Sequence, residues 1–172
     1  MKYIIILLLA FAACNNAGQT KQQGTEPLIL NEDPATGQSG YLSISGEIAI
    51  PFDKYEVCLT DTFRTHAIVL TKNDFKWVVI DRQEKVLYEV FPFDNGPDYP
   101  SDGLFRIVKN GKIGYADAAN FAIVIQPQFD CAFPFENGKA RVSNDCQTTT
   151  DGEHATWTSD NWQFVDKKGN KL

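Results

Sequence analysis

A four-residue pattern that recurs along the chain constrains its fold more than any other feature. The pattern is a pair of apolar or aromatic residues followed by a turn-forming residue, usually Asp. The last residues of its four copies are 38, 36 and 49 positions apart. Recurrence at such a period is typical of proteins built from stacked supersecondary units. The four copies are GYLS (Gly40–Ser43), VVID (Val78–Asp81), GYAD (Gly114–Asp117) and QFVD (Gln163–Asp166).

The residues around these copies predict short strands joined by tight turns. The stretch Leu104–Ala116 has two apolar runs joined by Asn110-Gly111, which is a strong hairpin signal. Gly beside the aromatic residue of a copy indicates close approach of a neighbouring backbone. No window shows the 3.6-residue period of a long amphipathic helix. The sequence therefore predicts an all-β fold of tandem antiparallel β-hairpin or meander repeats, in about three and a half units.

These units resemble the repeats of the bacterial WG-repeat family, which have a Trp-Gly, Tyr, Ile, Asp, Gly, Ile-Pro, Phe-Gly-Ala pattern. The best matches are Phe93–Asp117 and Ile125–Ser143. No unit keeps an intact Trp-Gly, because Trp77 and Trp162 lack the Gly and the other two copies lack the Trp. The resemblance implies a β-repeat domain over 40–172 that binds or scaffolds other molecules at the cell envelope. Its units are expected at about 40–77, 78–113, 114–162 and 163–172.

The first residues have the layout of a secretory signal, with Lys2, an apolar run from Tyr3 to Ala13, and then Cys14. The run is shorter than the roughly 20 residues of a spanning helix. Phe11–Cys14 resembles the lipobox of bacterial lipoproteins, although Phe11 stands where Leu is usual. This resemblance implies a signal peptide over 1–13 and a Cys14 that carries acyl chains such as palmitate. A plain cleaved signal peptide is the alternative.

Residues 14–39 are rich in Asn, Gln, Gly and Thr, and they are expected to form a flexible, lipidated tether. The short apolar stretch Leu28–Leu30 is the one part that could dock on the fold. No acidic residue closely follows Cys14. By resemblance to lipoproteins of the Bacteroidetes type, this composition implies a place in the bacterial cell envelope, on an outer membrane and facing the periplasm.

Three further cysteines lie in the repeat region. Cys131 and Cys146 flank one strand and are close enough in sequence for a disulfide, which an oxidising compartment permits. That pairing leaves Cys58 over. When the units are aligned on the recurring pattern, Cys58 falls within one position of the place that Cys131 has in its unit. A packed thiol and a Cys58–Cys131 bond between units both remain open.

An insertion in the third unit, Asp145–Trp162, holds the candidate ligand-binding residues. Insertions in repeat arrays commonly form loops on a binding face. The insertion could form a patch of rings and carboxylates for a glycan or a peptide. This patch would consist of Trp157, Asp160 and Asn161, with Asp151 and Glu153 nearby. Trp162 belongs to the repeat core, and a lid over the end of the array is an equally good interpretation of Trp157.

Signals for metal binding and catalysis are weak. His66 and His154 have no His or Cys at ligand spacing, and no nucleophile signature occurs. The loop Asp94–Gly103 has oxygen ligands suited to calcium, but its Asp, Asn, Gly and Pro are also ordinary turn formers, which we favour. The calcium candidates are Asp94, Asn95, Asp98 and Asp102.

The sequence therefore predicts a non-catalytic binding or scaffolding module without a cofactor or metal. Its expected partners are the membrane, through the lipid anchor, and an envelope protein or glycan. The net charge of −6 argues against nucleic acid. The alternative is an envelope glycan-acting hydrolase that uses paired carboxylates such as Asp98 and Glu136.

Overall fold

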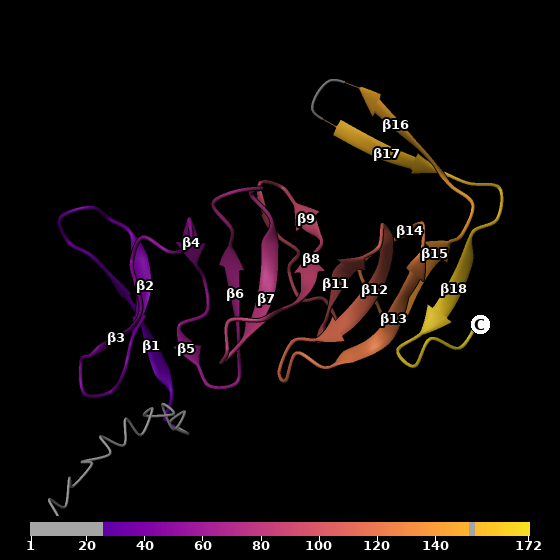
Figure 1. The fold of residues 1–172 in the computed structure, drawn as a ribbon. Coiled ribbons are helices and arrows are strands. Elements are labelled where there is room, and N and C mark those ends of the chain that lie inside the picture. Colours follow the sequence, from indigo (N-terminus) through magenta and orange to yellow (C-terminus); the bar gives the residue numbers. More distant parts are fainter. Residues whose placement is uncertain (1–25, 152–153) are drawn as a thin grey trace, which may run out of the picture.

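The computed structural model describes residues 26–151 and 154–172, and every regular element among them is a β-strand. The predicted signal peptide and Cys14 lie outside the described residues. Four consecutive meanders of antiparallel strands follow one another along an elongated array (Figure 1). This arrangement confirms the predicted fold class. No helix of the described part is long and apolar enough to cross a membrane.

Each meander has the recurring pattern on its central strand. The first consists of β1 (Leu28–Glu32), β2 (Ser39–Leu42) and β3 (Ile48–Ile50), and the second of β6 (His66–Leu70), β7 (Trp77–Asp81) and β8 (Val86–Val90). The third consists of β11 (Leu104–Lys109), β12 (Lys112–Asp117) and β13 (Ile123–Phe129). The fourth has β15 (Lys139–Ser143) and β18 (Gln163–Asp166), with a single bridge from Val165 to Lys171 in place of the third strand.

Short strands lie in the linkers between meanders. The first linker contains β4 (Val57–Cys58) and β5 (Thr62–Phe63), the second β9 (Pro92–Phe93) and β10 (Gly96–Pro97), and the third β14 (Cys131–Ala132). The insertion forms a separate hairpin of β16 (Gln147–Asp151) and β17 (His154–Thr158). The second and third meanders share one sheet of order β13-β12-β11-β8-β7-β6-β4. The first meander forms the sheet β3-β2-β1-β5, and the fourth the sheet β14-β15-β18.

The array begins earlier than the sequence predicted. Strand β1 pairs with β2 from Ile29 to Glu32, and the side chain of Leu28 is 8% exposed in the core. The predicted tether boundary at residue 39 is therefore wrong, because the apolar stretch at 28–30 supplies the first strand of the first meander. The predicted unit boundaries are shifted for the same reason: the pattern marks the middle of a unit and not its start.

The last residue of the pattern forms the turn into the third strand. The carboxylate of Asp81 accepts hydrogen bonds from the backbone N–H of Gln83 and of Lys85, both at 2.9 Å. Asp166 does the same for Lys168 and Asn170, both at 2.8 Å. An acidic side chain that satisfies two turn amides explains why Asp recurs at this position. Asp117 and Ser43 cap the equivalent turns.

Glycine at the first position of the pattern permits close strand contact. A Cβ added to Gly114 would lie 2.4 Å from the carbonyl oxygen of Ile125, and one added to Gly40 would lie 2.7 Å from that of Ile50. Both distances are far below van der Waals contact. The close backbone approach predicted from the sequence is therefore confirmed at these two copies.

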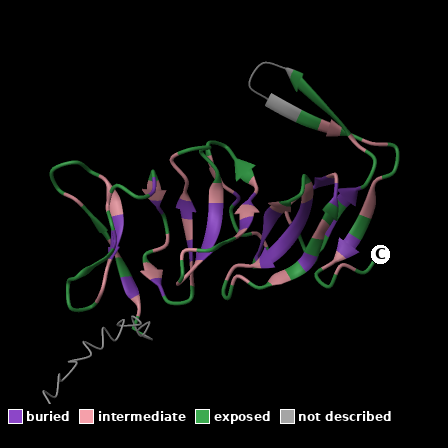
Figure 2. Ribbon diagram, in the orientation of Figure 1, coloured by how far each residue is buried: buried purple, intermediate pink, exposed green. Residues whose placement is uncertain are grey.

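The hydrophobic cores lie between consecutive meanders. We call the side of a meander toward the following unit its forward face and the opposite side its backward face. Residues of the pattern's second position, such as Tyr115, pack from the forward face against Ala140, Val142 and Val165 of the next unit. Tyr41 and Val79 are placed in the same way in the two preceding cores. Interior strands are thus buried on both faces, which explains their continuous apolar runs (Figure 2).

Candidate binding surface at the C-terminal end of the array

The forward face of the fourth meander has no following unit among the described residues. The second-position residues Tyr41, Val79 and Tyr115 are 0% exposed, whereas the equivalent Phe164 is 43% exposed. Its cross-strand partner Arg141 is exposed as well. Along β15 and β18 exposed residues therefore alternate with buried ones, as expected for strands with one open face (Figure 2).

Cations and rings interleave on this open face. The guanidinium carbon of Arg141 lies 4.3 Å from the ring centroid of Phe133 and 4.7 Å from that of Trp162. The ammonium of Lys139 lies 4.9 Å from the centroid of Phe164. Each such contact contributes about 0.5–1 kcal/mol at an exposed site. We call these residues the aromatic–cation surface: Phe133, Lys139, Arg141, Trp162 and Phe164.

Arg141 lies over the faces of two rings that also contact each other, which restricts its orientation while leaving the residue exposed. A guanidinium is always charged, and it can bind a carboxylate through two parallel hydrogen bonds. Stacking prearranges the group, so less side-chain freedom is lost when a ligand binds. The surface therefore has the chemistry to bind an acidic group and an apolar group side by side.

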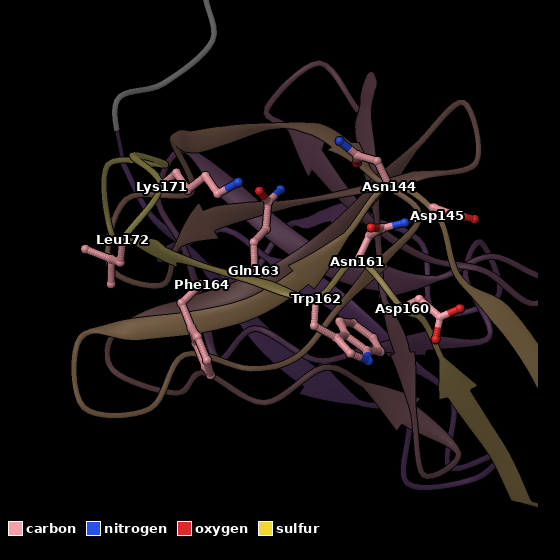
Figure 3. A pocket seen from close by; sticks show the side chains of 9 residues that line it. All are labelled: Asn144, Asp145, Asp160, Asn161, Trp162, Gln163, Phe164, Lys171 and Leu172. Carbon is pink, nitrogen blue, oxygen red and sulfur yellow. Dashed lines mark hydrogen bonds between the residues drawn. The ribbon is translucent and has the colours of Figure 1, made fainter.

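Two shallow pockets flank Phe164. In Figure 3, the side chains of Trp162 and Phe164 extend to the same side of β18. The smaller pocket, about 280 Å³, is lined by Phe133, Pro134, Glu136, Asn137, Lys139, Arg141 and Phe164. The larger, about 520 Å³, is lined by Asn144, Asp145, Asp160, Asn161, Trp162, Gln163, Phe164, Lys171 and Leu172 (Figure 3).

Asp160 and Asn161, two of the predicted ligand-binding residues, are exposed and line the larger pocket. The side-chain amide of Asn161 donates to the carboxylate of Asp145 at 2.9 Å. They lie beside Trp162, which the sequence had assigned to the core and which is half-buried. The side chains of residues 151–155, which include the further candidates Asp151 and Glu153, lie outside the described residues.

Trp157, the third predicted ligand-binding residue, is not a freely exposed ring. It is half-buried and packs edge-on against Phe91 and Phe133, at centroid distances of 5.8 and 5.5 Å. The prediction of an exposed binding residue is wrong here, because the indole covers the apolar cluster beneath the hairpin β16–β17. The indole packs on two linker residues, so it also differs from the lid over the end of the array that was the other interpretation.

The base of the insertion is held by a disulfide and a hydroxyl network. Cys131 and Cys146 are bonded to each other, with their Cα atoms 6.3 Å apart, as the sequence predicted. The buried hydroxyl of Ser143 lies 2.8 Å from that of Ser159 and donates to the carbonyl of Asp145 at 3.1 Å. These contacts fix the start and the end of the insertion against the fourth meander.

Cys58 is the free cysteine among the described residues, and it is buried. Its thiol donates to the carbonyl of Ser39 at 3.7 Å, and its N–H donates to the Ser39 hydroxyl at 2.7 Å. Burial raises the pKa of this thiol to about 11. The packed-thiol alternative is therefore the correct one, and the side chain is a poor nucleophile at neutral pH.

Asp98 is fully engaged in the interior. It is 6% exposed and Arg106 is 3% exposed. One carboxylate oxygen accepts from the Arg106 Nε–H at 3.0 Å and from its backbone N–H at 2.7 Å, and the other accepts from Nη2. The suggestions that Asp98 binds calcium, or pairs with Glu136 in glycan hydrolysis, are therefore wrong, because Arg106 binds both of its oxygens.

The remaining calcium candidates have turn-forming roles. Asp94 and Asn95 have φ values of 48° and 63°, the left-handed conformation that Asp and Asn tolerate well. The carboxylate of Asp102 accepts from the N–H of Gly138 at 2.7 Å. In the part of the chain that the structure describes, no group of three or more His, Cys, Asp or Glu side chains could hold a metal ion. The backbone of Asp94 and Asn95 agrees with the turn interpretation, whereas the carboxylate of Asp102 bonds across to a later turn.

Comparison with known proteins supports the repeat assignment for one unit. The family model described as "WG containing repeat" matches residues 113–145, from β12 to the residues just after β15. No curated protein and no solved structure matches the chain. The chain thus contains a WG-type β repeat within an all-β array.

Most of the aromatic–cation surface was missed from the sequence. Four of its residues occupy repeat positions, where the pattern predicts a role in the fold: Phe133, Lys139, Arg141 and Phe164. A signal was present, since β15 has Lys and Arg at alternating positions where β11 has Leu104 and Arg106. These positions form a surface because no further meander covers them among the described residues.

Proposed function

We propose that the chain is a non-catalytic binding module of the bacterial cell envelope, which contacts its partner through the aromatic–cation surface. The observation that carries this proposal is the open forward face of the fourth meander. There Phe164 is 43% exposed, and Arg141 is stacked on the adjacent rings of Phe133 and Trp162. Aromatic residues and Arg are the side chains enriched in the energetically dominant parts of protein interfaces.

The anchor in this proposal is Cys14, acylated after removal of residues 1–13. Support comes from the lipobox-like sequence Phe11–Cys14 and the polar residues that follow it. The first meander forms one end of the described array, and β15 and β18, which carry residues of the aromatic–cation surface, lie at the other end (Figure 1). An array anchored at Cys14 would hold this surface away from the membrane. We propose that this membrane is the outer membrane and that the array faces the periplasm.

The partner is inferred to be an envelope protein or glycan with acidic groups. The chain has a net charge of −6, yet the open face carries Lys139 and Arg141. Cations gathered on one surface of an acidic protein favour association with a carboxylate-bearing surface, and salt weakens that association. Binding is therefore expected to weaken as the ionic strength rises.

In-cell cross-linking of the full chain, followed by mass spectrometry of the recovered partners, tests this proposal. Arg141→Glu and Phe164→Ala are expected to reduce recovery of a specific partner at least about tenfold, the effect of losing 1.4 kcal/mol or more. Arg64→Glu and Phe75→Ala are the matched controls, since both residues are exposed and lie in earlier parts of the array. Recovery that is equal in all four variants would contradict the proposal.

A further inference from the structure

The first meander also has an open face, on its backward side. Ile29 is 41% exposed, whereas the equivalent Ala67, Phe105 and Ala140 are 0%, 3% and 1% exposed. Its cross-strand partner Leu42 is partly exposed, although Ile80, Ala116 and Val165 at the same position are nearly fully buried. An apolar row is thus uncovered at the beginning of the array, on the face that every later meander buries.

The interior of the array shows what covers such a face. The backward face of the second meander packs on the forward face of the first, and the same contact recurs twice more. The two ends of the molecule therefore carry the two complementary halves of one repeated interface. The backward half, with Ile29 and Leu42, lies at the first meander, and the forward half, with Phe164 and Arg141, lies at the fourth.

The charges of the two ends are complementary. Residues 26–53 contain acidic side chains and no Lys or Arg. The fourth meander and its turn contain a cluster of exposed cations. Opposite charges at two surfaces speed their association and fix their relative orientation. The acidic residues of the first end are Glu26, Glu32, Asp33, Glu47 and Asp53. The cations of the other end are Lys139, which lies across from Asp166, with Arg141, Lys168 and Lys171, whereas Lys167 donates to the carbonyl of Asp102.

We propose that the aromatic–cation surface of one copy binds the backward face of the first meander of a second copy. This inference rests on the proposed function, because it names the partner of the same surface. The contact uses two different surfaces, so it is heterologous and can repeat from copy to copy. Each added copy extends the array by four meanders, and the segment before residue 26 gives every copy its own anchor.

Sedimentation velocity of the full chain in mild detergent, over a range of concentrations, tests the head-to-tail contact. The first variant, Ile29→Gln/Leu42→Gln, makes the backward face polar, and the second, Arg141→Glu, reverses a charge on the forward face. Each variant alone is expected to weaken self-association at least tenfold. A 1:1 mixture retains one intact pair of faces, so it is expected to give a dimer and nothing larger.

Two controls keep the result interpretable. Lys85→Glu, which changes an exposed lysine in the turn between β7 and β8 of the second meander, should associate as the wild type does. Melting temperatures and far-UV circular dichroism show whether the variants are folded. A wild-type chain that is monomeric throughout, a variant that still associates normally, or a mixture that stays monomeric would each overturn the head-to-tail contact.

The cross-linking experiment separates this failure from failure of the proposed function. The wild type could be monomeric while Arg141→Glu abolishes the cross-linking of a different protein or a glycan in cells. The surface then binds a partner other than a second copy. In that case the proposed function stands and the head-to-tail contact is wrong. If neither experiment responds to Arg141→Glu, both are wrong.

Discussion

The hydroxyl of Tyr115 donates a hydrogen bond of 2.7 Å to the backbone carbonyl of Phe133, 18 residues further along the chain. Tyr41 makes the equivalent bond of 2.9 Å to Thr60, 19 residues further along. Both side chains are fully buried, and burial raises the pKa of both hydroxyls. Each bond ties the central strand of a meander to the linker that leads into the next one.

Tyr115→Phe is expected to destabilise the fold by about 1–2 kcal/mol, because it leaves the buried carbonyl of Phe133 without this donor. Urea denaturation followed by tryptophan fluorescence measures the change. Tyr99→Phe is the control, since Tyr99 is 65% exposed. An equal effect of the two substitutions would show that the bond contributes nothing.

Gly114→Ala is expected to destabilise by at least about 2 kcal/mol or to prevent folding, because the new Cβ meets three backbone atoms at 2.4–2.8 Å. Backbone atoms cannot move aside as the end of a flexible side chain can. Gly96→Ala is the matched control, since its Cβ would have no neighbour closer than 3.7 Å. Thermal melts of the two variants test the difference, and similar melting temperatures would contradict it.

Asp98→Ala is expected to cost about 3–5 kcal/mol, because it leaves the guanidinium of Arg106 buried and without its carboxylate. The double variant Asp98→Ala/Arg106→Leu removes the charge too and should recover part of that loss. Denaturant titrations of the single and double variants measure both values. A double variant less stable than Asp98→Ala would mean that the ion pair is not the source of the effect.

Reduction of the Cys131–Cys146 disulfide is expected to lower stability by about 3 kcal/mol, the chain-entropy value for a loop of 15 residues. For a domain of this size the melting temperature should fall by roughly 6–12 °C. Melts with and without dithiothreitol give the shift. If reduction lowers the melting temperature of Cys58→Ala by the same amount, the effect comes from the disulfide. If the effect is lost in that variant, Cys58 is its source.

Stability should decrease as the pH rises from 9 toward 11. Burial raises the pKa of Cys58 from the ordinary 9.0 to about 11, so the unfolded chain loses this proton first and gains stability relative to the fold. Below pH 9 the thiol keeps its proton in both the folded and the unfolded chain, so its contribution to the free energy of unfolding is complete. Cys58→Ala should flatten this part of the profile between pH 9 and 10, as measured by urea denaturation at each pH. An unchanged slope would exclude Cys58 as its source.

The strand pattern was predictable because it depends on local chemistry. Asn110 and Gly111 have φ values of 54° and 72°, as a tight hairpin requires, and Asp81 caps its turn through its own neighbours. Strand β1 was missed because its amides are paired by β2 and β5, which no local signal reports. The role of Asp98 was missed for the same kind of reason: its partner Arg106 meets it only after β11 pairs with β12 and β8.

The candidate surface depended on the order of the units. Arg106 and Arg141 occupy equivalent positions, yet the first is 3% exposed and the second lies open. Both arginines stand at the same repeat position of an alternating strand, so periodicity alone does not distinguish them. What distinguishes them is whether another meander follows in space.

Strands β4 and β5 lie three residues apart in the chain but belong to different sheets. Strand β4 pairs with β6, and β5 pairs with β1. The two sheets cannot separate unless one of these pairings opens, so the linker does not act as a hinge. The spacing between the first two meanders is therefore fixed by the linker itself, which pairs with the sheet on each side of it.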